Sequence, residues 1–305
     1  MNHDTLRRFP QSPNHNAPHV KSTVNAGIAA SIFSSVGFAS MDALTKQLVA
    51  TLAPANLLLF RSLFILLLFT PLALLLFGKA IFRTEARQET LWRSLAFFLT
   101  SALIVVSLRY LTLAETISIY FISPILTILL AAWWLKEKLT LGAGVACVLG
   151  FIGVVLIIQP FQRTGDTAMW AYVLPVLAAG TGAVTDVLSR KMKGRASPAT
   201  LLIYGVFATA IGGAALAIGD VPALPAPRDL LLLLATAACG VVAFFFVIAS
   251  FQLAPAGVIA PLRFLNMVWA VLLGYFIWGS VPNAIAAAGI ALVLASGLIG
   301  LREAR

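Results

Sequence analysis

Ten apolar stretches, each about as long as a membrane-crossing helix, restrict the fold of this sequence more than any other feature. A membrane helix needs ~20 mostly apolar residues to cross the ~30 Å hydrocarbon layer. Only 10% of the residues are charged and 60% are hydrophobic, whereas soluble domains carry about 25% charged residues. The stretches are apolar on all sides, unlike the alternating strands of membrane barrels. The sequence therefore predicts an all-α integral membrane protein, with helices over 24–49, 56–77, 91–111, 115–135, 139–158, 168–190, 199–219, 229–252, 255–279 and 282–301.

The basic residues are distributed unevenly between the two sides of this arrangement. If the polar segment 1–23 is a cytoplasmic tail, fifteen of the 21 lysines and arginines fall in inner segments, and only Arg163 and Arg228 fall in outer loops. Cytoplasmic loops are enriched in Lys and Arg. We therefore expect a multi-pass protein of the bacterial cell inner membrane, with both termini cytoplasmic and an uncleaved first helix. The same distribution argues against nucleic-acid binding, despite the net charge of +10.

A short motif occurs twice, 144 positions apart. Asp-x-Leu-Thr-Lys at 42–46 matches Asp-x-Leu-Ser-Arg at 186–190, and "ANLLLF" at 55–60 matches "ATLLIY" at 199–204. We interpret 24–158 and 168–301 as two copies of a five-helix unit. Because five is odd, the second copy enters the membrane inverted. Inverted repeats are a recurring transporter design, in which the substrate site lies near the midplane between the halves.

With these features the chain resembles the drug/metabolite transporter superfamily, EamA type, across residues 24–301. The resemblance rests on the two five-helix halves, the motif at 42–46 and 186–190, "FRSLF" at 60–64 and "ETISIYFISPILTILLAAWWLKEKLT" at 115–140. The segments "MDALTK", "TDVLSR" and "APLRFLN" are most similar to the branch that holds S-adenosylmethionine and riboflavin transporters. The chain departs from the family pattern at Lys136, where Gly is commoner, and in lacking an acid after Gly279. The resemblance implies a ten-helix transporter.

Two acid–base pairs lie within or at the ends of the predicted helices. Asp42 and Lys46, like Asp186 and Arg190, are four residues apart, so each pair shares one helix face. Ionisable groups inside a membrane are costly and are commonly functional. Two interpretations stay open for these four residues. They form neutralised pairs that fix packing or line a gate, or the acids carry a coupled proton.

Two further arginines lie inside predicted helices. Arg61, in the second helix, either pairs with Asp42 or contacts substrate. Arg263, in the ninth helix, lies on a face of small residues beside Asn266, and we favour a substrate contact over a structural role. Guanidinium groups bind carboxylate and phosphate through paired hydrogen bonds. We therefore expect a substrate that carries one of these groups.

The fourth predicted helix presents polar side chains on one face, at spacings of four, three and four: Thr116, Tyr120, Ser123 and Thr127. We expect Tyr120 and Ser123 to contribute to the substrate site, together with Trp269 of the ninth helix. Hydrogen bonding between helices is the alternative for this face. The site is then expected among helices 1, 3, 4, 6, 8 and 9.

Other functional classes fit these residues less well. The predicted helices contain no His, and Cys147 and Cys239 lie alone in separate helices, which argues against an enzyme or a metal site. No Gly-Lys-[Ser/Thr] loop is present for an ATP-driven pump. A channel would need a ring of carbonyls or charges, which two inverted copies do not readily supply.

We therefore predict a secondary active transporter that needs no cofactor and works by alternating access in the lipid bilayer. Its predicted substrate is a small polar metabolite with a carboxylate or phosphate, amino-acid-like or opine-like, that is exported. The alternative is uptake of a vitamin or cofactor such as riboflavin or S-adenosylmethionine. A membrane assembly protein is less favoured, and whether the chain forms a homodimer stays open.

Overall fold

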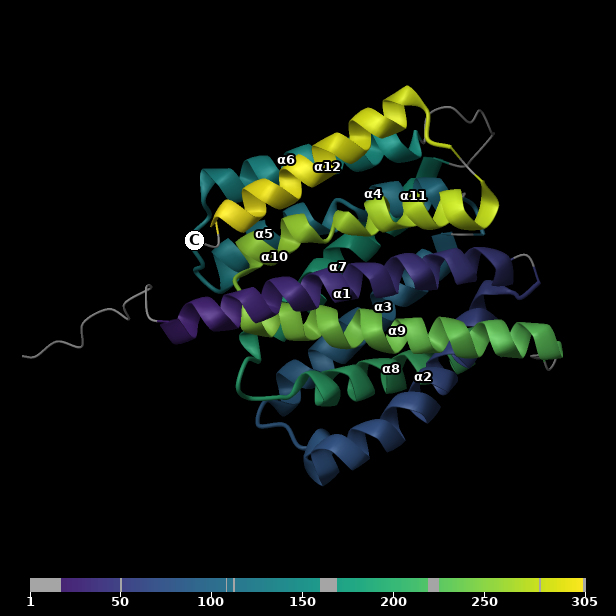
Figure 1. The fold of residues 1–305 in the computed structure, drawn as a ribbon. Helices are drawn as coiled ribbons and strands as arrows, with labels where there is room; N and C mark the ends of the chain where they lie inside the picture. Colours follow the sequence, from purple (N-terminus) through teal and green to yellow (C-terminus); the bar gives the residue numbers. More distant parts are fainter. Residues whose placement is uncertain are drawn as a thin grey trace, which may run out of the picture.

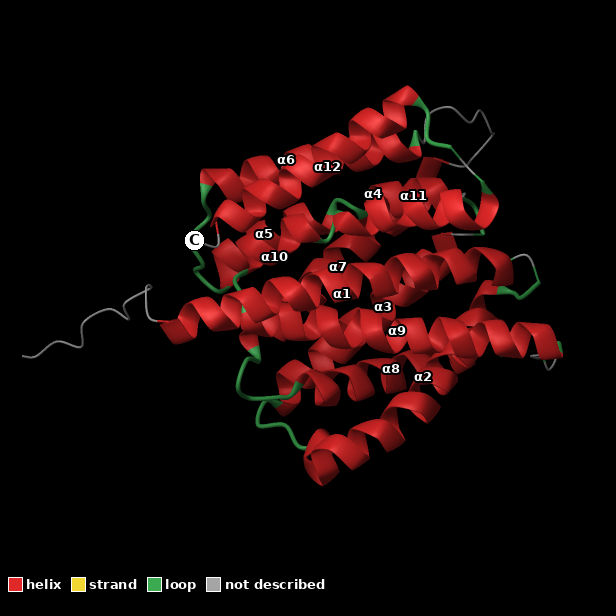
Figure 2. Ribbon diagram, viewed as in Figure 1, coloured by secondary structure: helices red, strands yellow, loops and turns green. Residues whose placement is uncertain are grey.

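The computed structural model describes residues 18–49, 51–107, 109–111, 113–159, 169–218, 225–279 and 281–303. Most of the predicted tail and the loop that contains Arg163 lie outside these residues. Within them, regular structure is entirely helical (Figure 2). The helices are α1 (Pro18–Leu48), α2 (Pro54–Phe77), η1 (Gly78–Phe82), α3 (Arg87–Ser107), α4 (Leu113–Tyr120), α5 (Ser123–Trp134), α6 (Leu141–Ile158), η3 (Met169–Tyr172), α7 (Val173–Lys191), α8 (Pro198–Leu216), α9 (Pro227–Leu253), α10 (Ala256–Leu262), α11 (Leu265–Trp278) and α12 (Ala284–Glu303).

Ten stretches of the described residues are long and apolar enough to cross a membrane. Their ends agree with the predicted helices to within a few residues, so the prediction of an all-α membrane protein with ten membrane helices is confirmed. The fourth and ninth predicted helices differ in one respect, because each is divided in two. The fourth consists of α4 and α5, and the ninth consists of α10 and α11.

Both interruptions occur beside a proline. Pro124 has no N–H to donate to the carbonyl of Tyr120, and the helix is interrupted just before it, at residues 121–122. Pro261 likewise leaves the carbonyl of Gly257 without its helical donor, and the chain then tightens, with Arg263 N donating to Ala260 O at 3.2 Å. The two interruptions meet inside the protein. The buried rings of Phe121 and Phe264 lie 5.8 Å apart between centroids.

The main helix contacts each join one helix from residues 24–158 with one from residues 168–301. The helix α1 packs along α9 through the middle of the molecule, α6 packs on α12, α2 on α8, and α3 on α7 (Figure 1). The two parts of the chain therefore share one interior rather than forming separate domains.

Glycine allows the closest of these approaches. A Cβ on Gly153 of α6 would lie 2.7 Å from the carbonyl oxygen of Gly289 on α12, and a Cβ on Gly289 would lie 2.6 Å from the carbonyl oxygen of Gly153. Small residues let backbones approach in membranes, where dispersion contacts are the main source of helix association.

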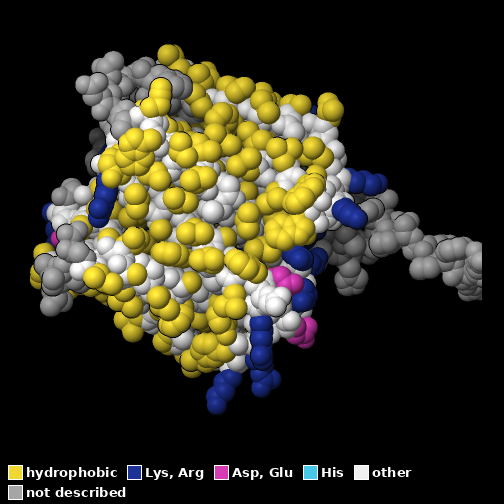
Figure 3. Space-filling view, turned by 180° about the vertical axis from the view of Figure 1, so that it is seen from behind, with side chains coloured by type: hydrophobic (Ala, Val, Ile, Leu, Met, Phe, Trp, Pro, Cys, Tyr) yellow, Lys and Arg dark blue, Asp and Glu magenta, His cyan; other side chains and the backbone are white. Residues whose placement is uncertain are grey.

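The outer surface is suited to lipid. Large apolar side chains are exposed on several helices, among them Leu75 at 85%, Trp133 at 78% and Phe276 at 77%. Figure 3 shows one face covered by hydrophobic side chains, with most of its Lys and Arg side chains at one end. Exposed apolar surface of this extent is unfavourable in water, whereas a bilayer covers it.

Candidate functional site

A polar cavity of about 180 Å³ lies inside the bundle, between the two parts of the chain. Side chains from α1, α2, α3, α4, α5, α7, α9 and α11 line it, so the six membrane helices expected at the site all contribute and α2 contributes in addition. Aromatic rings of Phe38, Phe97, Phe121 and Phe244 form part of its wall. Five charged side chains also line it: Arg61, Arg93, Arg263, Asp42 and Asp186. Three cations thus face two acids in a largely apolar interior.

One group of these charges surrounds Asp186 on α7. Arg263, at the interruption between α10 and α11, forms an ion pair with Asp186 through its Nη1. Tyr120, the last residue of α4, interacts electrostatically with the same guanidinium. Buried charges are stable only when they are paired, and this pair joins the sixth membrane helix to the interruption of the ninth. Arg263 therefore faces the cavity as a cation that is paired with Asp186.

Arg93 on α3 is the second cation that acts on Asp186. It is 2% exposed, and its guanidinium donates to Ser189 Oγ at 2.7 Å and to Leu201 O at 2.8 Å. The absence of a side chain at Gly205 leaves room for it, since a Cβ there would lie 3.3 Å from Arg93 Nη1. These contacts hold the charge of Arg93 in a fixed position.

Sequence reasoning missed Arg93 and assigned it to the cytoplasmic flank of the third helix. The pattern that identifies it is the helical face Arg93, Phe97, Thr100 and Ile104, all of which line the cavity. An arginine at one end of such a face points inward rather than to the cytoplasm.

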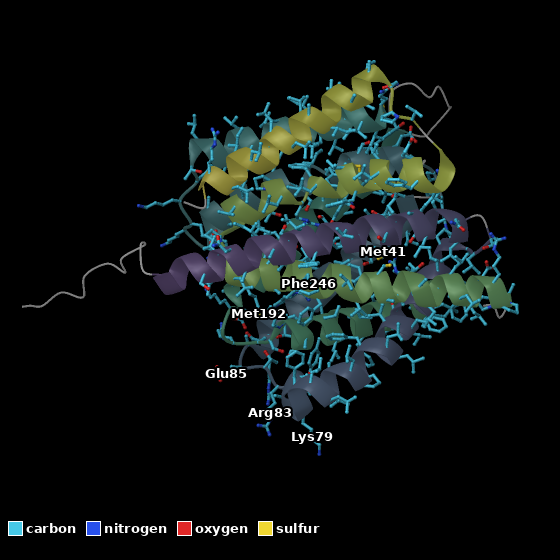
Figure 4. All side chains as sticks on the ribbon, in the orientation of Figure 1. Met41, Lys79, Arg83, Glu85, Met192 and Phe246 are labelled. Atoms are coloured by element: carbon cyan, nitrogen blue, oxygen red, sulfur yellow. The ribbon has the colours of Figure 1, made fainter. Side chains whose placement is uncertain are left out.

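The second charged group surrounds Asp42 on α1. Asn266 Nδ2 donates to Asp42 Oδ2 at 3.4 Å, and Arg61 on α2 interacts with Asp42 electrostatically. Both predicted roles of Arg61, pairing with Asp42 and contact with substrate, stay predictions. Lys46 is exposed one turn further along α1 and is not among the described residues that line the cavity. Figure 4 labels Met41, the neighbour of Asp42 in this lining, between α1 and α9.

The predicted pairing of Asp186 with Arg190 is wrong. Arg190 Nε instead donates to Glu137 Oε1 at 2.7 Å, and its Nη1 donates to the carbonyl oxygens of Phe251 and Gln252. Glu137 Oε2 also accepts from the N–H of Ala256 at 3.0 Å. Arg190 lies one turn beyond Asp186 on the same helix, but an acid from the segment after α5 reaches it. We call this group the Glu137–Arg190 clamp, because it ties the ends of α7 and α9 to the start of α10.

The remaining predicted site residues lie at or next to the cavity. Tyr120 and Asn266 line it, whereas Ser123 and Trp269 lie behind its lining. Trp269 Nε1 donates to Ser35 Oγ at 3.1 Å, and Ser35 faces the cavity. The Oδ1 of Asn266 and the Oγ of Ser123 are buried without a hydrogen-bond partner among the described residues. An unpaired buried acceptor is costly, so Asn266 Oδ1 is available to a donor group that enters the cavity.

The part of the chain that the structure describes holds no group of three His, Cys, Asp or Glu side chains that could bind a metal ion. Cys147 and Cys239 are free thiols in separate helices.

Comparison with known proteins agrees with this architecture. Residues 25–159 and residues 169–301 each match the EamA-like transporter family. A solved crystal structure superimposes with a TM-score of 0.80, covering 93% of this chain and 98% of that chain at 18% identity, which is evidence for the fold alone.

Curated relatives match over most of their length. An S-adenosylmethionine uptake transporter of Rickettsia conorii is 27% identical over 278 residues, which cover 90% of this chain and 92% of the relative. A riboflavin transporter of Rhizobium johnstonii is 28% identical, with 89% of each chain covered. A pseudopaline exporter of Pseudomonas aeruginosa is 24% identical, with 89% of this chain and 94% of the relative covered.

Proposed function

Because the chain belongs to the EamA-like transporter family, we propose that it is a secondary active transporter that moves a small polar metabolite through the central cavity. The observation that carries this proposal is the cavity itself. Arginines and aspartates from distant parts of the chain converge in it, and ionisable groups inside a membrane are costly and commonly mark a substrate path. The family supports transport rather than enzymatic activity.

The proposed mechanism is alternating access between two inverted five-helix halves, residues 24–158 and 168–301. The helix pairs that join the two parts of the chain support it, as do the two interrupted helices that meet at Phe121 and Phe264. Interrupted helices are typical of the substrate sites of inverted-repeat transporters. A cavity of about 180 Å³ is smaller than the ~300–1,000 Å³ of common ligand pockets, so a cofactor-sized substrate requires the halves to move apart.

For the substrate we favour uptake of a vitamin or cofactor with an amino-acid end, of the S-adenosylmethionine kind. The relative named as an S-adenosylmethionine uptake transporter supports uptake of this kind, and the relative named as a riboflavin transporter supports a vitamin or cofactor as the substrate. A carboxylate of such a ligand would compete for Arg61 or Arg263, and its ammonium group would donate to Asn266 Oδ1 or Asp42. Export of an opine-like compound is the second candidate, which the pseudopaline exporter supports.

An untargeted comparison of metabolites in cells and medium tests these proposals, using deletion and overexpression strains. We expect an S-adenosylmethionine-like compound to accumulate inside cells that overproduce the protein and are supplied with it. Loss of an opine-like compound from the cells into the medium would favour the second candidate. No difference between the strains for any metabolite would contradict a transport function.

In the orientation that we propose, both termini are cytoplasmic. The Glu137–Arg190 clamp then lies at the cytoplasmic end, since both residues end inward-running membrane helices. It joins the ends of three membrane segments one helical turn beyond Asp186 of the cavity lining, which supports a role as the inner gate.

A further inference from the structure

A second and wider hollow lies at the end of the bundle where α2 ends, away from the central cavity. It has a volume of about 1020 Å³ and is bordered by η1 and the loop after it, the start of α3 and the loop that leads into α8. Three arginines line this basic cleft, Arg83, Arg87 and Arg195, together with one acid, Glu85. Figure 4 shows Arg83 and Glu85 at this end of the molecule. None of these four charged residues lines the central cavity.

Two of the three arginines are available to a ligand. Arg195 donates to Glu89 at 3.0 Å, so its charge is partly neutralised. Arg83 and Arg87 are exposed, and neither forms an ion pair or a side-chain hydrogen bond with another described residue. A guanidinium group has five N–H donors in a fork that matches the oxygens of a phosphate. The cleft therefore presents two such forks, with Glu85 as the one acid of its lining.

The backbone adds positive charge to the same place. The helix α3 begins at Arg87 and α8 begins at Pro198, after the cap that Ser197 Oγ forms with the N–H of Thr200 at 3.1 Å. Both helices start at the border of the cleft. A helix N-terminus carries a partial positive charge and unpaired N–H groups, which favour an anion nearby.

The cleft continues into the lipid-facing surface of α3. Leu91 lines the cleft and is 65% exposed, and Leu95 and Leu99 follow at intervals of four on the same face, both exposed. A small soluble anion has no apolar part that could pack against this strip of leucines. A phospholipid places a phosphate at the membrane edge and an acyl chain along the helix below it.

We propose that the basic cleft binds the phosphate of an anionic phospholipid. Arg83 and Arg87 donate to the phosphate oxygens, and one acyl chain lies along Leu91, Leu95 and Leu99. Basic pockets between membrane helices at the cytoplasmic side commonly bind acidic headgroups. This site is separate from the central cavity and does not depend on which metabolite the cavity carries.

Native mass spectrometry of the detergent-purified chain tests the proposal, with phosphatidylglycerol as the probe and phosphatidylcholine as the zwitterionic comparison. The double variant Arg83→Gln/Arg87→Gln should bind phosphatidylglycerol roughly thirtyfold more weakly than wild type, because each basic residue near the surface contributes about fivefold. The matched control is Lys136→Gln/Lys138→Gln, which removes the same charge outside the cleft and should bind like wild type. Both pairs are exposed, so unchanged melting temperatures are expected.

Four results would overturn the proposal. Equal losses in the two double variants would show general attraction to basic charge rather than a site. Equal binding of phosphatidylcholine, or no retention of phosphatidylglycerol by wild type, would show that the cleft does not select an anionic headgroup. Displacement of the lipid by millimolar inorganic phosphate would assign the cleft to a soluble anion instead.

Discussion

At the residue scale, the two carboxylates of the cavity meet different cations. Asp186 is paired with Arg263 and also lies in the field of Arg93, whereas Asp42 faces Arg61 and accepts a hydrogen bond from Asn266. Asp42 is the more easily displaced from its partners, since the hydrogen bond that it accepts from Asn266 is long at 3.4 Å and comes from a neutral amide. Substrate entry is therefore expected to disturb Asp42 first.

Replacing Asp42 with Asn should lower the transport rate by at least roughly tenfold, because Arg61 then lacks its counter-charge inside the bundle. A second substitution, Arg61→Gln, should restore part of the rate. Lys79→Gln is the control, since Lys79 is exposed on η1 and lies outside the cavity lining, and it should transport like wild type. Initial uptake rates at several pH values measure all of these variants.

Two results would change this interpretation. A wild-type rate in Asp42→Asn would exclude a role for the carboxylate. If the double variant stayed inactive and the pH dependence of transport disappeared, Asp42 would instead carry a coupled proton.

The sequence allowed some of these residues to be predicted but not their partners. Asp42, Arg61, Asp186 and Arg263 stand out because ionisable side chains are rare in apolar helices. The pairing of Asp186 with Arg263 joins positions 77 apart along the chain, and only the packed bundle brings them together. The spacing of four that suggested Arg190 as the partner of Asp186 reflects only the geometry of a single helix. In the folded protein Arg190 pairs with Glu137 instead.

At the element scale, close packing of α6 on α12 depends on the absence of side chains at their contact. Gly153→Ala should destabilise the protein by about 1–3 kcal/mol, because the new Cβ would lie 2.7 Å from the carbonyl oxygen of Gly289. Gly144→Ala is a matched control in the same helix, since a Cβ there meets nothing within 4 Å. Thermal unfolding in detergent measures the difference. Equal melting temperatures for the two variants would mean that the helices separate easily.

The Glu137–Arg190 clamp is the element-scale device that we expect to keep one end of the cavity closed. Glu137→Gln should make Thr185→Cys, in a Cys147→Ser/Cys239→Ser background, react about fivefold faster with a membrane-impermeant thiol reagent from the cytoplasmic side. Loss of a partly exposed ion pair worth ~1 kcal/mol accounts for that factor.

Glu89→Gln is the matched control for the clamp. It removes another Glu–Arg pair, with Arg195, which lies outside the cavity lining. With Glu89→Gln, Thr185→Cys should react with the thiol reagent at the same rate as it does in the background that retains both Glu89 and Glu137. If both substitutions accelerated the thiol reaction equally, the protein would have become more open in general. If Glu137→Gln did not accelerate it, the Glu137–Arg190 clamp would not be a gate.

Hydropathy alone was sufficient to predict the membrane helices, because burial in lipid demands continuous apolar length whatever the tertiary contacts. The interruptions of the fourth and ninth helices were only partly predictable. Pro124 and Pro261 indicated which carbonyls lose their donors. Where each helix then breaks depends on packing, here on the contact between Phe121 and Phe264.

At the scale of the whole molecule, the proposed inversion of the halves makes a topology prediction. Reporter fusions after residues 85, 137, 193 and 305 should report the cytoplasm, and fusions after 52, 164 and 224 should report the outside. The uneven distribution of Lys and Arg sets this orientation. A cytoplasmic report at both 164 and 224 would contradict the inverted repeat.

Counterflow in proteoliposomes tests most directly whether substrate passes through the charged cavity. Vesicles preloaded with unlabelled S-adenosylmethionine should accumulate the labelled compound when they contain wild type. Arg263→Ala should reduce the apparent affinity roughly ten- to a hundredfold, since charge-assisted hydrogen bonds are worth ~1.5–3 kcal/mol, and Arg263→Lys should lie between the two. Arg228→Ala, an exposed arginine outside the cavity, is the control. A well-folded Arg263→Ala that exchanges substrate as wild type does would contradict transport through this cavity.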